Sequence, residues 1–163
     1  MRNLEFANGE FYHVCNRGVD KRNIVSDKRD VDRFIQALIE FNTVKPHGGI
    51  YENSFRKPKK EPRLVNIVAY CLNPNHFHLL LEQASDQGIS KFIKRVCGGY
   101  TQYFNKKYKR SGVLFQGKYK SVPVVDNEQL LYVSAYINLN NKVHQLGSRT
   151  AKSSWDEFVR GKA

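Results

Sequence analysis

The stretch LVNIVAYCLNPNHFHLLLEQ, residues 64–83, predicts the centre of the fold. Two apolar runs, 64–71 and 76–83, flank Asn and Pro residues that suit a turn, so we expect an antiparallel hairpin. Because side chains alternate along a strand, His76 and His78 project from one face and Phe77 points into a core on the other. Two imidazoles placed in this way can share one metal ion, although a strand histidine is more often only hydrogen-bonded.

The segments around this hairpin predict the rest of a sheet and its helices. The expected elements are strands over 10–17 and 119–125, and helices that start after Asp27, at residue 89, and at Asp126 with an end at Asn138 or a little beyond. The order β, α, β, β, α, β, α predicts an α+β fold. It is a ferredoxin-like split βαβ antiparallel sheet with an additional C-terminal helix.

The length of 163 residues fits one domain spanning 1–163. Prolines, paired glycines and basic residues in 45–63 indicate a loop or ribbon insertion, and 148–163 is expected to form a C-terminal tail. Three widely spaced cysteines without a CxxC pair indicate neither a disulfide framework nor a zinc knuckle. Without a signal peptide or a long apolar run, we expect no membrane association, a cytoplasmic location, and a place on the nucleoid when DNA is bound.

Positive charge is concentrated in one part of the chain. Basic residues number 27 against 15 acidic ones, a net charge of +12, and no Asp or Glu occurs between Gln87 and Val125. Aromatic residues, whose faces can stack unpaired bases, are interleaved there, which favours nucleic acid over a membrane surface. A solvated basic face that serves only solubility remains the alternative. The candidates for phosphate or base contacts are Arg17, Lys94, Arg95, Asn105, Gln116, Lys118 and Lys120.

The last predicted helix carries Tyr136 and Asn140, one turn apart on one face. If that face lies against His76 and His78, two imidazoles, an amide oxygen and a phenol surround one point. A divalent ion held there by His76, His78 and Asn140 would polarise a phosphodiester, and Tyr136 would attack phosphorus and keep the cut end as a phosphotyrosine. The donor set suits Mn²⁺, and Mg²⁺ is also acceptable.

Four sequence blocks resemble the HUH-type single-tyrosine transposases of small bacterial insertion sequences and their REP-associated relatives. The blocks are YHVCNRG (12–18), CLNPNHFHLL (71–80), YTQYFN (100–105) with SGVLFQGKYKS (111–121), and YINLN (136–140). The resemblance implies a single-stranded DNA endonuclease and strand transferase that forms a 5′-phosphotyrosine, often at a hairpin near an element end. It leaves open a monomer or a homodimer that exchanges the tyrosine helix, and a self-mobilising or a host role.

Three positions depart from the family pattern. Asn73 stands where methionine is usual, Lys118 where arginine is common, and Asn141 where a proline normally follows the asparagine. None of these changes removes a predicted ligand or the nucleophile.

Two other functions remain open on the sequence. A ferredoxin-like sheet with basic and aromatic residues also describes a non-catalytic module that binds single-stranded nucleic acid. Tyr132, one turn before Tyr136, resembles the second tyrosine of rolling-circle replication nickases, although the surrounding blocks favour the single-tyrosine family.

Overall fold

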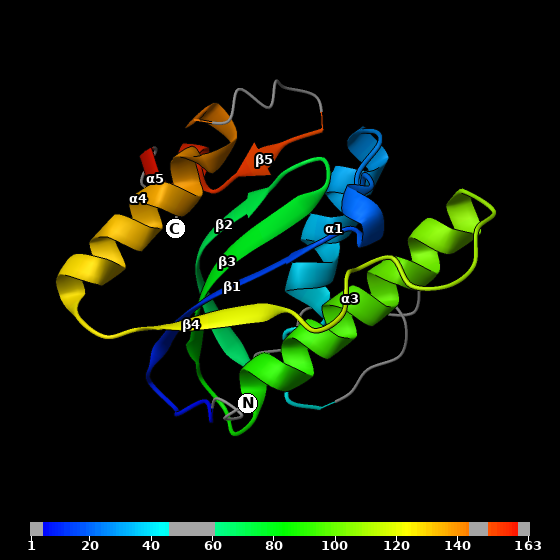
Figure 1. Cartoon of the computed structure of the whole chain (residues 1–163). Helices are drawn as coiled ribbons and strands as arrows, with labels where there is room; N and C mark the ends of the chain where they lie inside the picture. The colour runs from blue at the N-terminus through cyan, green and yellow to red at the C-terminus, as the bar shows by residue number, and fades with distance from the viewer. Residues whose placement is uncertain (1–4, 46–60, 144–149, 160–163) are drawn as a thin grey trace.

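Five strands form one antiparallel sheet in the order β4-β1-β3-β2-β5 (Figure 1). The computed structural model describes residues 5–45, 61–143 and 150–159. The strands are β1 (Phe11–Arg17), β2 (Val65–Leu72), β3 (His76–Gln83), β4 (Lys120–Val124) and β5 (Lys152–Ser153). The helices are η1 (Val19–Lys21), α1 (Lys28–Glu40), α3 (Gly88–Lys107), α4 (Asn127–Val143) and α5 (Trp155–Val159).

This arrangement confirms the predicted ferredoxin-like fold, with the short strand β5 as an addition beside β2. Most of the predicted insertion at 45–63 and parts of the predicted tail at 148–163 lie outside the described residues. No helix in the described ranges has the length and apolar character that a membrane span requires.

The two faces of the sheet are covered by different helices. Figure 1 shows α1 and α3 on one side of the sheet and α4 on the other. The alternation of β1 and β3 sends Tyr12, Val14 and Phe77 toward α1 and α3, where they are buried in the main apolar core. The opposite face holds a smaller cluster, in which Leu80 of β3 packs with Ile137 of α4.

A buried carboxylate joins α1 to α3. Asp27 caps α1 as predicted, accepting a hydrogen bond of 3.0 Å from the backbone of Asp30. The Asp30 side chain is fully buried and accepts hydrogen bonds from Lys107 (2.7 Å), Tyr103 (2.9 Å) and Tyr108 (2.6 Å). Burial alone would raise the pKa of Asp30, but these donors outweigh it and lower the pKa. The ionised carboxylate therefore fixes the two helices together.

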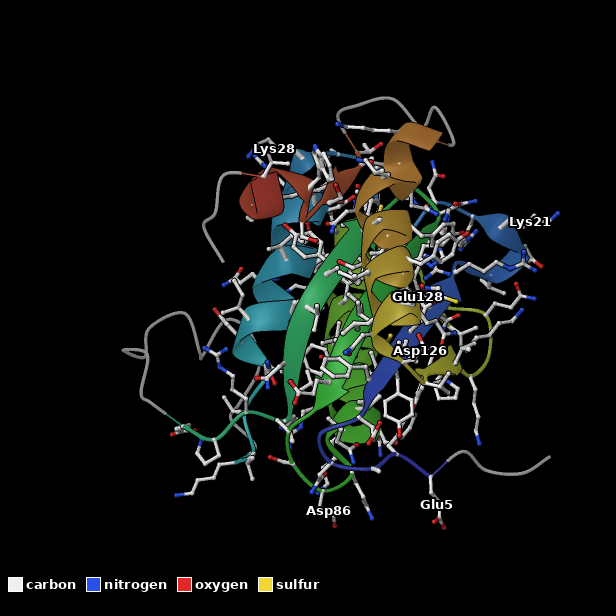
Figure 2. All side chains as sticks on the ribbon, turned by 90° about the vertical axis from the view of Figure 1, so that its left-hand side faces the viewer. Glu5, Lys21, Lys28, Asp86, Asp126 and Glu128 are labelled. Carbon is white, nitrogen blue, oxygen red and sulfur yellow. The ribbon has the colours of Figure 1, made fainter. Side chains whose placement is uncertain are left out.

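The C-terminal segment holds α4 against the sheet. Ser154 donates a 2.5 Å hydrogen bond to Asn138 Oδ1 on α4 and accepts one of 2.9 Å from the backbone of Tyr70 on β2. The ammonium of Lys142 lies 5.2 Å from the centre of the Trp155 ring. Figure 2, viewed from this side, shows α4 lying over the strands. The tail thus connects the helix that carries Tyr136 to the edge of the sheet.

Candidate active site

The central strands place three histidines on the face that α4 covers. In the antiparallel pairing of β1 with β3, Cys15 lies opposite His78, and Arg17 lies opposite His76. The His76 and His78 rings lie 5.1 Å apart between centroids, while Phe77 between them is fully buried on the other face. The alternation expected for the predicted metal pair is therefore present.

Asn73 connects His76 to the predicted ligand on α4. Its Nδ2 donates one hydrogen bond to Asn140 Oδ1 (2.7 Å) and another to His76 Nε2 (2.9 Å). The two acceptor atoms, from elements far apart in sequence, therefore converge on one point. Asn73 and Asn140 are fully buried, and Asn140 Nδ2 has no hydrogen-bond partner within the described parts of the chain.

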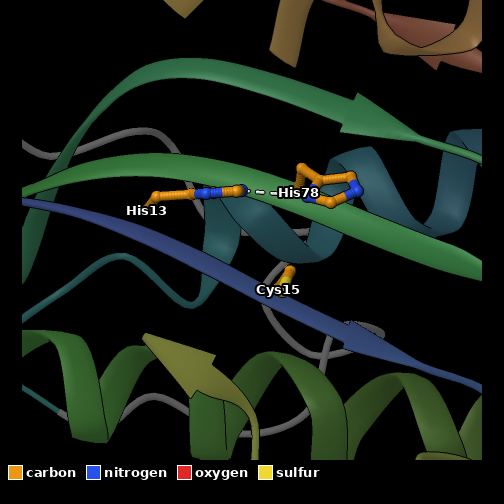
Figure 3. Close-up of side chains that lie close together, drawn as sticks. All are labelled: His13, Cys15 and His78. Carbon is orange, nitrogen blue, oxygen red and sulfur yellow. Dashed lines mark hydrogen bonds between the residues drawn. The ribbon is translucent and has the colours of Figure 1, made fainter. Parts of the chain in front are cut away.

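Each histidine of the pair is oriented by a neighbouring polar side chain. His76 Nδ1 donates to Asn75 Oδ1 over 2.6 Å, which leaves Nε2 as the acceptor that faces Asn73 and Asn140. His78 Nδ1 lies 2.9 Å from His13 Nε2 (Figure 3). Burial lowers the pKa of His13, which favours the neutral ring.

Tyr136 lies beside the same histidines of its own chain. Its ring centre is 5.9 Å from that of His78 and 6.2 Å from that of His13, both in edge-on orientations. The side chain is 40% exposed, so a substrate can reach it. Tyr132, one turn earlier, is 72% exposed. The structure thus gathers His76, His78, Tyr136 and Asn140 within one subunit.

A pocket of about 490 Å³ opens beside His76 and His78. None of the described residues that line the pocket is acidic. Four of them carry a positive charge, namely Arg17, Lys21, Lys118 and Lys120. Arg17 Nε donates a 2.7 Å hydrogen bond to Gln116, which also lines the pocket. The pocket therefore presents positive charge and hydrogen-bond donors next to the two imidazoles, a combination suited to a phosphate group.

The remaining DNA-contact candidates lie outside this pocket lining. Lys94 is exposed on α3, Arg95 donates to the backbone oxygen of Thr43 (2.6 Å), and Asn105 donates to that of Gly112 (2.9 Å). Four of the aromatic side chains interleaved with the basic residues are buried in the main core and are not available to stack bases, namely Phe92, Tyr100, Phe104 and Phe115. Phe92, Tyr100 and Phe104 recur at helical spacing on α3 because they pack in this core, and the sequence pattern alone does not distinguish such packing from base stacking.

No sequence pattern predicts a role for His13 or Asn75, and Asn73 stands out in the sequence only as a departure from the family pattern. The alternation of β1 already put His13 and Cys15 on one face. The missing information was the register of β1 against β3, which brings His13 diagonally next to His78. Asn141 replaces the proline that is usual in the family. Because Asn141 has a backbone N–H, α4 can continue past it to Val143.

Comparison with known proteins identifies the family of this chain. The family model described as transposase IS200 like matches residues 49–140, more than half of the chain. The chain belongs to the IS200-like transposase family. It is accordingly an enzyme of the class that cuts and joins DNA during transposition.

Two solved structures are similar to this transposase. A REP-associated tyrosine transposase bound to a REP hairpin superimposes with a TM-score of 0.65 at 11% identity, covering 100% of this chain and 87% of that one. A protein from Deinococcus radiodurans R1, provisionally described as a transposase, gives a TM-score of 0.49 at 16% identity, with coverages of 84% and 95%. The first likeness supports the fold. No curated protein matches the sequence significantly.

Proposed function

We propose that this transposase is a metal-dependent single-stranded DNA endonuclease and strand transferase that acts through Tyr136. The observation that carries the proposal is the convergence of His76 Nε2 and Asn140 Oδ1 on one point, with His78 and Tyr136 beside it and a basic pocket at its edge. A non-catalytic binding module has no use for this combination.

His76, His78 and Asn140 would hold the divalent ion. Their two imidazole nitrogens and one amide oxygen fit Mn²⁺ well and Mg²⁺ acceptably. When bound, the ion would polarise a phosphate oxygen and neutralise charge that develops on it. The orphan Nδ2 of Asn140 is consistent with an amide that is placed for its oxygen, and Asn73 holds that oxygen near His76 Nε2.

Tyr136 would supply the nucleophile. Its phenol oxygen forms a bond to phosphorus, and the bond from phosphorus to the 3′ oxygen of the preceding nucleotide breaks. The phenol proton is lost to water, and the departing 3′ oxygen takes a proton from water. The product is a 5′-phosphotyrosine, and attack by a 3′-hydroxyl in the reverse sense would rejoin a strand. Because Tyr136 lies beside the histidines of its own chain, we propose that one subunit can contain the whole site.

The substrate class follows from the pocket and from the structural relative. Arg17, Gln116, Lys118 and Lys120 provide donors for the backbone next to the scissile phosphate. The similar REP-associated transposase is bound to a REP hairpin, and we propose a hairpin-bearing single strand for this chain as well.

The test is formation of a covalent adduct. Wild-type protein mixed with single-stranded hairpin oligonucleotides and Mn²⁺ or Mg²⁺ should give a denaturant-stable protein–DNA band that carries the 5′ end of the downstream fragment. Tyr136→Phe should abolish the band, and the matched variant Tyr132→Phe, one turn away on the same helix, should retain it.

Two results would overturn the proposal. Salt-dependent binding without any adduct, across a broad hairpin set and with both ions, would favour the non-catalytic module. Equal loss of the adduct in Tyr132→Phe and Tyr136→Phe would instead favour a two-tyrosine nickase.

A further inference from the structure

Strands β1 and β3 bring together a second set of metal-ligand types that overlaps with the proposed catalytic centre. His13 and Cys15 come from alternate positions of β1, and His78 comes from the facing position of β3 (Figure 3). One ligand atom from each of these three side chains lies within 4.8 Å of the other two. All three side chains are half-buried, so they are preorganised but reachable.

The chemistry of this set differs from that of His76, His78 and Asn140. A cysteine thiolate with two imidazoles favours Zn²⁺ or Co²⁺, whereas an amide oxygen in place of sulfur favours harder ions. Zn–S and Zn–N bonds of about 2.3 and 2.0 Å in a tetrahedron place two nitrogens roughly 3.3 Å apart and a nitrogen and a sulfur roughly 3.5 Å apart. Small side-chain rotations would therefore close the present cluster around an ion, with the fourth position left to water.

The basic pocket described above leads to this ligand set. Cys15 pairs with Lys120 across β1 and β4, at the edge of the pocket that both residues line. Cys15 and His78 also line the basic pocket, which is open to small solutes. On binding, the thiol would release its proton to water.

His78 belongs to both ligand sets. A neutral imidazole has only one nitrogen lone pair available to a metal, because the other nitrogen carries the proton. An ion held by His13, Cys15 and His78 therefore removes His78 from the set that contains His76 and Asn140.

We propose that His13, Cys15 and His78 form a soft-metal site for Zn²⁺ or Co²⁺, and that occupation of this site inhibits the transposase by withdrawing His78. The existence of the site stands on the cluster alone. The inhibitory effect rests on the proposed function.

Cobalt spectroscopy tests the site without DNA or activity. With a non-thiol reductant present, Co²⁺ should bind wild-type protein at one equivalent and give a thiolate-to-cobalt charge-transfer band in the near ultraviolet. Cys15→Ser should lose the band, and both Cys15→Ser and His13→Ala should bind Co²⁺ at least about tenfold more weakly. Cys97→Ser, which changes a half-buried thiol on α3, is the matched control and should retain the band.

Absence of the band in folded wild-type protein would overturn the proposal. So would a band that survives in Cys15→Ser, and in particular one that disappears in Cys71→Ser instead. Circular dichroism of each variant establishes that a lost band does not reflect unfolding.

A separate measurement tests inhibition. In Mn²⁺, stoichiometric Zn²⁺ should reduce adduct formation by wild type and by Cys97→Ser, and should reduce it much less in Cys15→Ser when each variant is compared with its own zinc-free rate. Equal inhibition of all three would refute the inhibitory role. A wild type that never forms an adduct would refute the proposed nuclease function, while the cobalt band would still decide whether the soft-metal site exists.

Discussion

The two faces of the sheet are built differently. The face under α1 and α3 is a large aromatic and aliphatic core, and its buried carboxylate, Asp30, is surrounded by donors. The face under α4 has a small apolar cluster and buries Asn73, Asn138 and Asn140, one of which keeps an amide nitrogen without a partner in the described chain.

The face under α1 and α3 therefore mainly stabilises the fold, and the face under α4 carries the candidate active site. Apolar burial on the first face supplies most of the driving force for folding. Buried polar groups are costly unless they are hydrogen-bonded, so the second face is stable only through a few specific contacts, such as those of Asn73 and Ser154. The sheet can therefore carry a polar site on one face because the other face holds the fold.

Asp30→Asn should be the most damaging substitution for stability. It replaces an acceptor oxygen with a donor and removes the charge that faces Lys107, so we expect a loss of about 3–5 kcal/mol in the free energy of unfolding. Asp32→Asn on the same helix, which breaks the exposed pair with Lys28, should cost less than about 0.5 kcal/mol. Chemical denaturation measures both.

Asp30 also predicts how stability depends on pH. Because its folded pKa lies below its unfolded value of about 3.9, its contribution is complete above that value and is lost as the pH falls toward the folded pKa. Asp30→Asn should therefore show a flatter stability profile between roughly pH 5 and pH 2 than wild type. Parallel profiles would contradict the assigned role of this carboxylate.

Leu79 and Leu80 are a matched pair, adjacent on β3, fully buried, and on opposite faces. Leu79→Ala should cost about 2–5 kcal/mol, and Leu80→Ala should fall in the lower part of that range because the thinner α4 layer can close over the cavity. Leu80→Ala should also slow adduct formation, since Leu80 packs with Ile137 next to Tyr136. If Leu80→Ala is the more destabilising variant and leaves activity intact, the two faces do not divide stability and activity in this way.

Asn73→Leu keeps the size of the side chain but removes the donor shared by His76 and Asn140. We expect a loss of about 1–3 kcal/mol without metal. Saturating Mn²⁺ should raise the melting temperature of this variant more than that of wild type, because the ion no longer competes with the Asn73 amide for the same two acceptors. Equal shifts would show that these acceptors do not hold the ion.

Alanine substitutions at Gly98 and Gly99 should give the smallest changes in stability, and the two changes should have opposite signs. A methyl group at Gly98 meets no atom within 4 Å, so Gly98→Ala should stabilise α3 by about 0.5–1 kcal/mol. A methyl group at Gly99 would lie 2.6 Å from Cε2 of Phe41, so Gly99→Ala should destabilise the protein. Thermal unfolding separates the two signs, and a gain in both variants would mean that this layer is looser than described.

Local sequence was sufficient for the elements of the fold. The strand at 76–83, the cap at Asp27 and the 126/129 capping pattern of α4 all depend on interactions within a few residues, and the structure confirms them. Strand β5 could not be predicted, because two residues carry no periodic pattern and the strand exists only by pairing with β2.

The sequence by itself determined the chemical groups and their local faces: His76 with His78, Tyr136 with Asn140, and the basic segment that supplies the pocket. Only the tertiary structure decided which groups meet, because strand register and helix docking set distances between residues more than 60 positions apart. It joined Asn73 to Asn140 and His13 to His78, and it separated Arg17 and Lys120 at the pocket from Lys94 on α3.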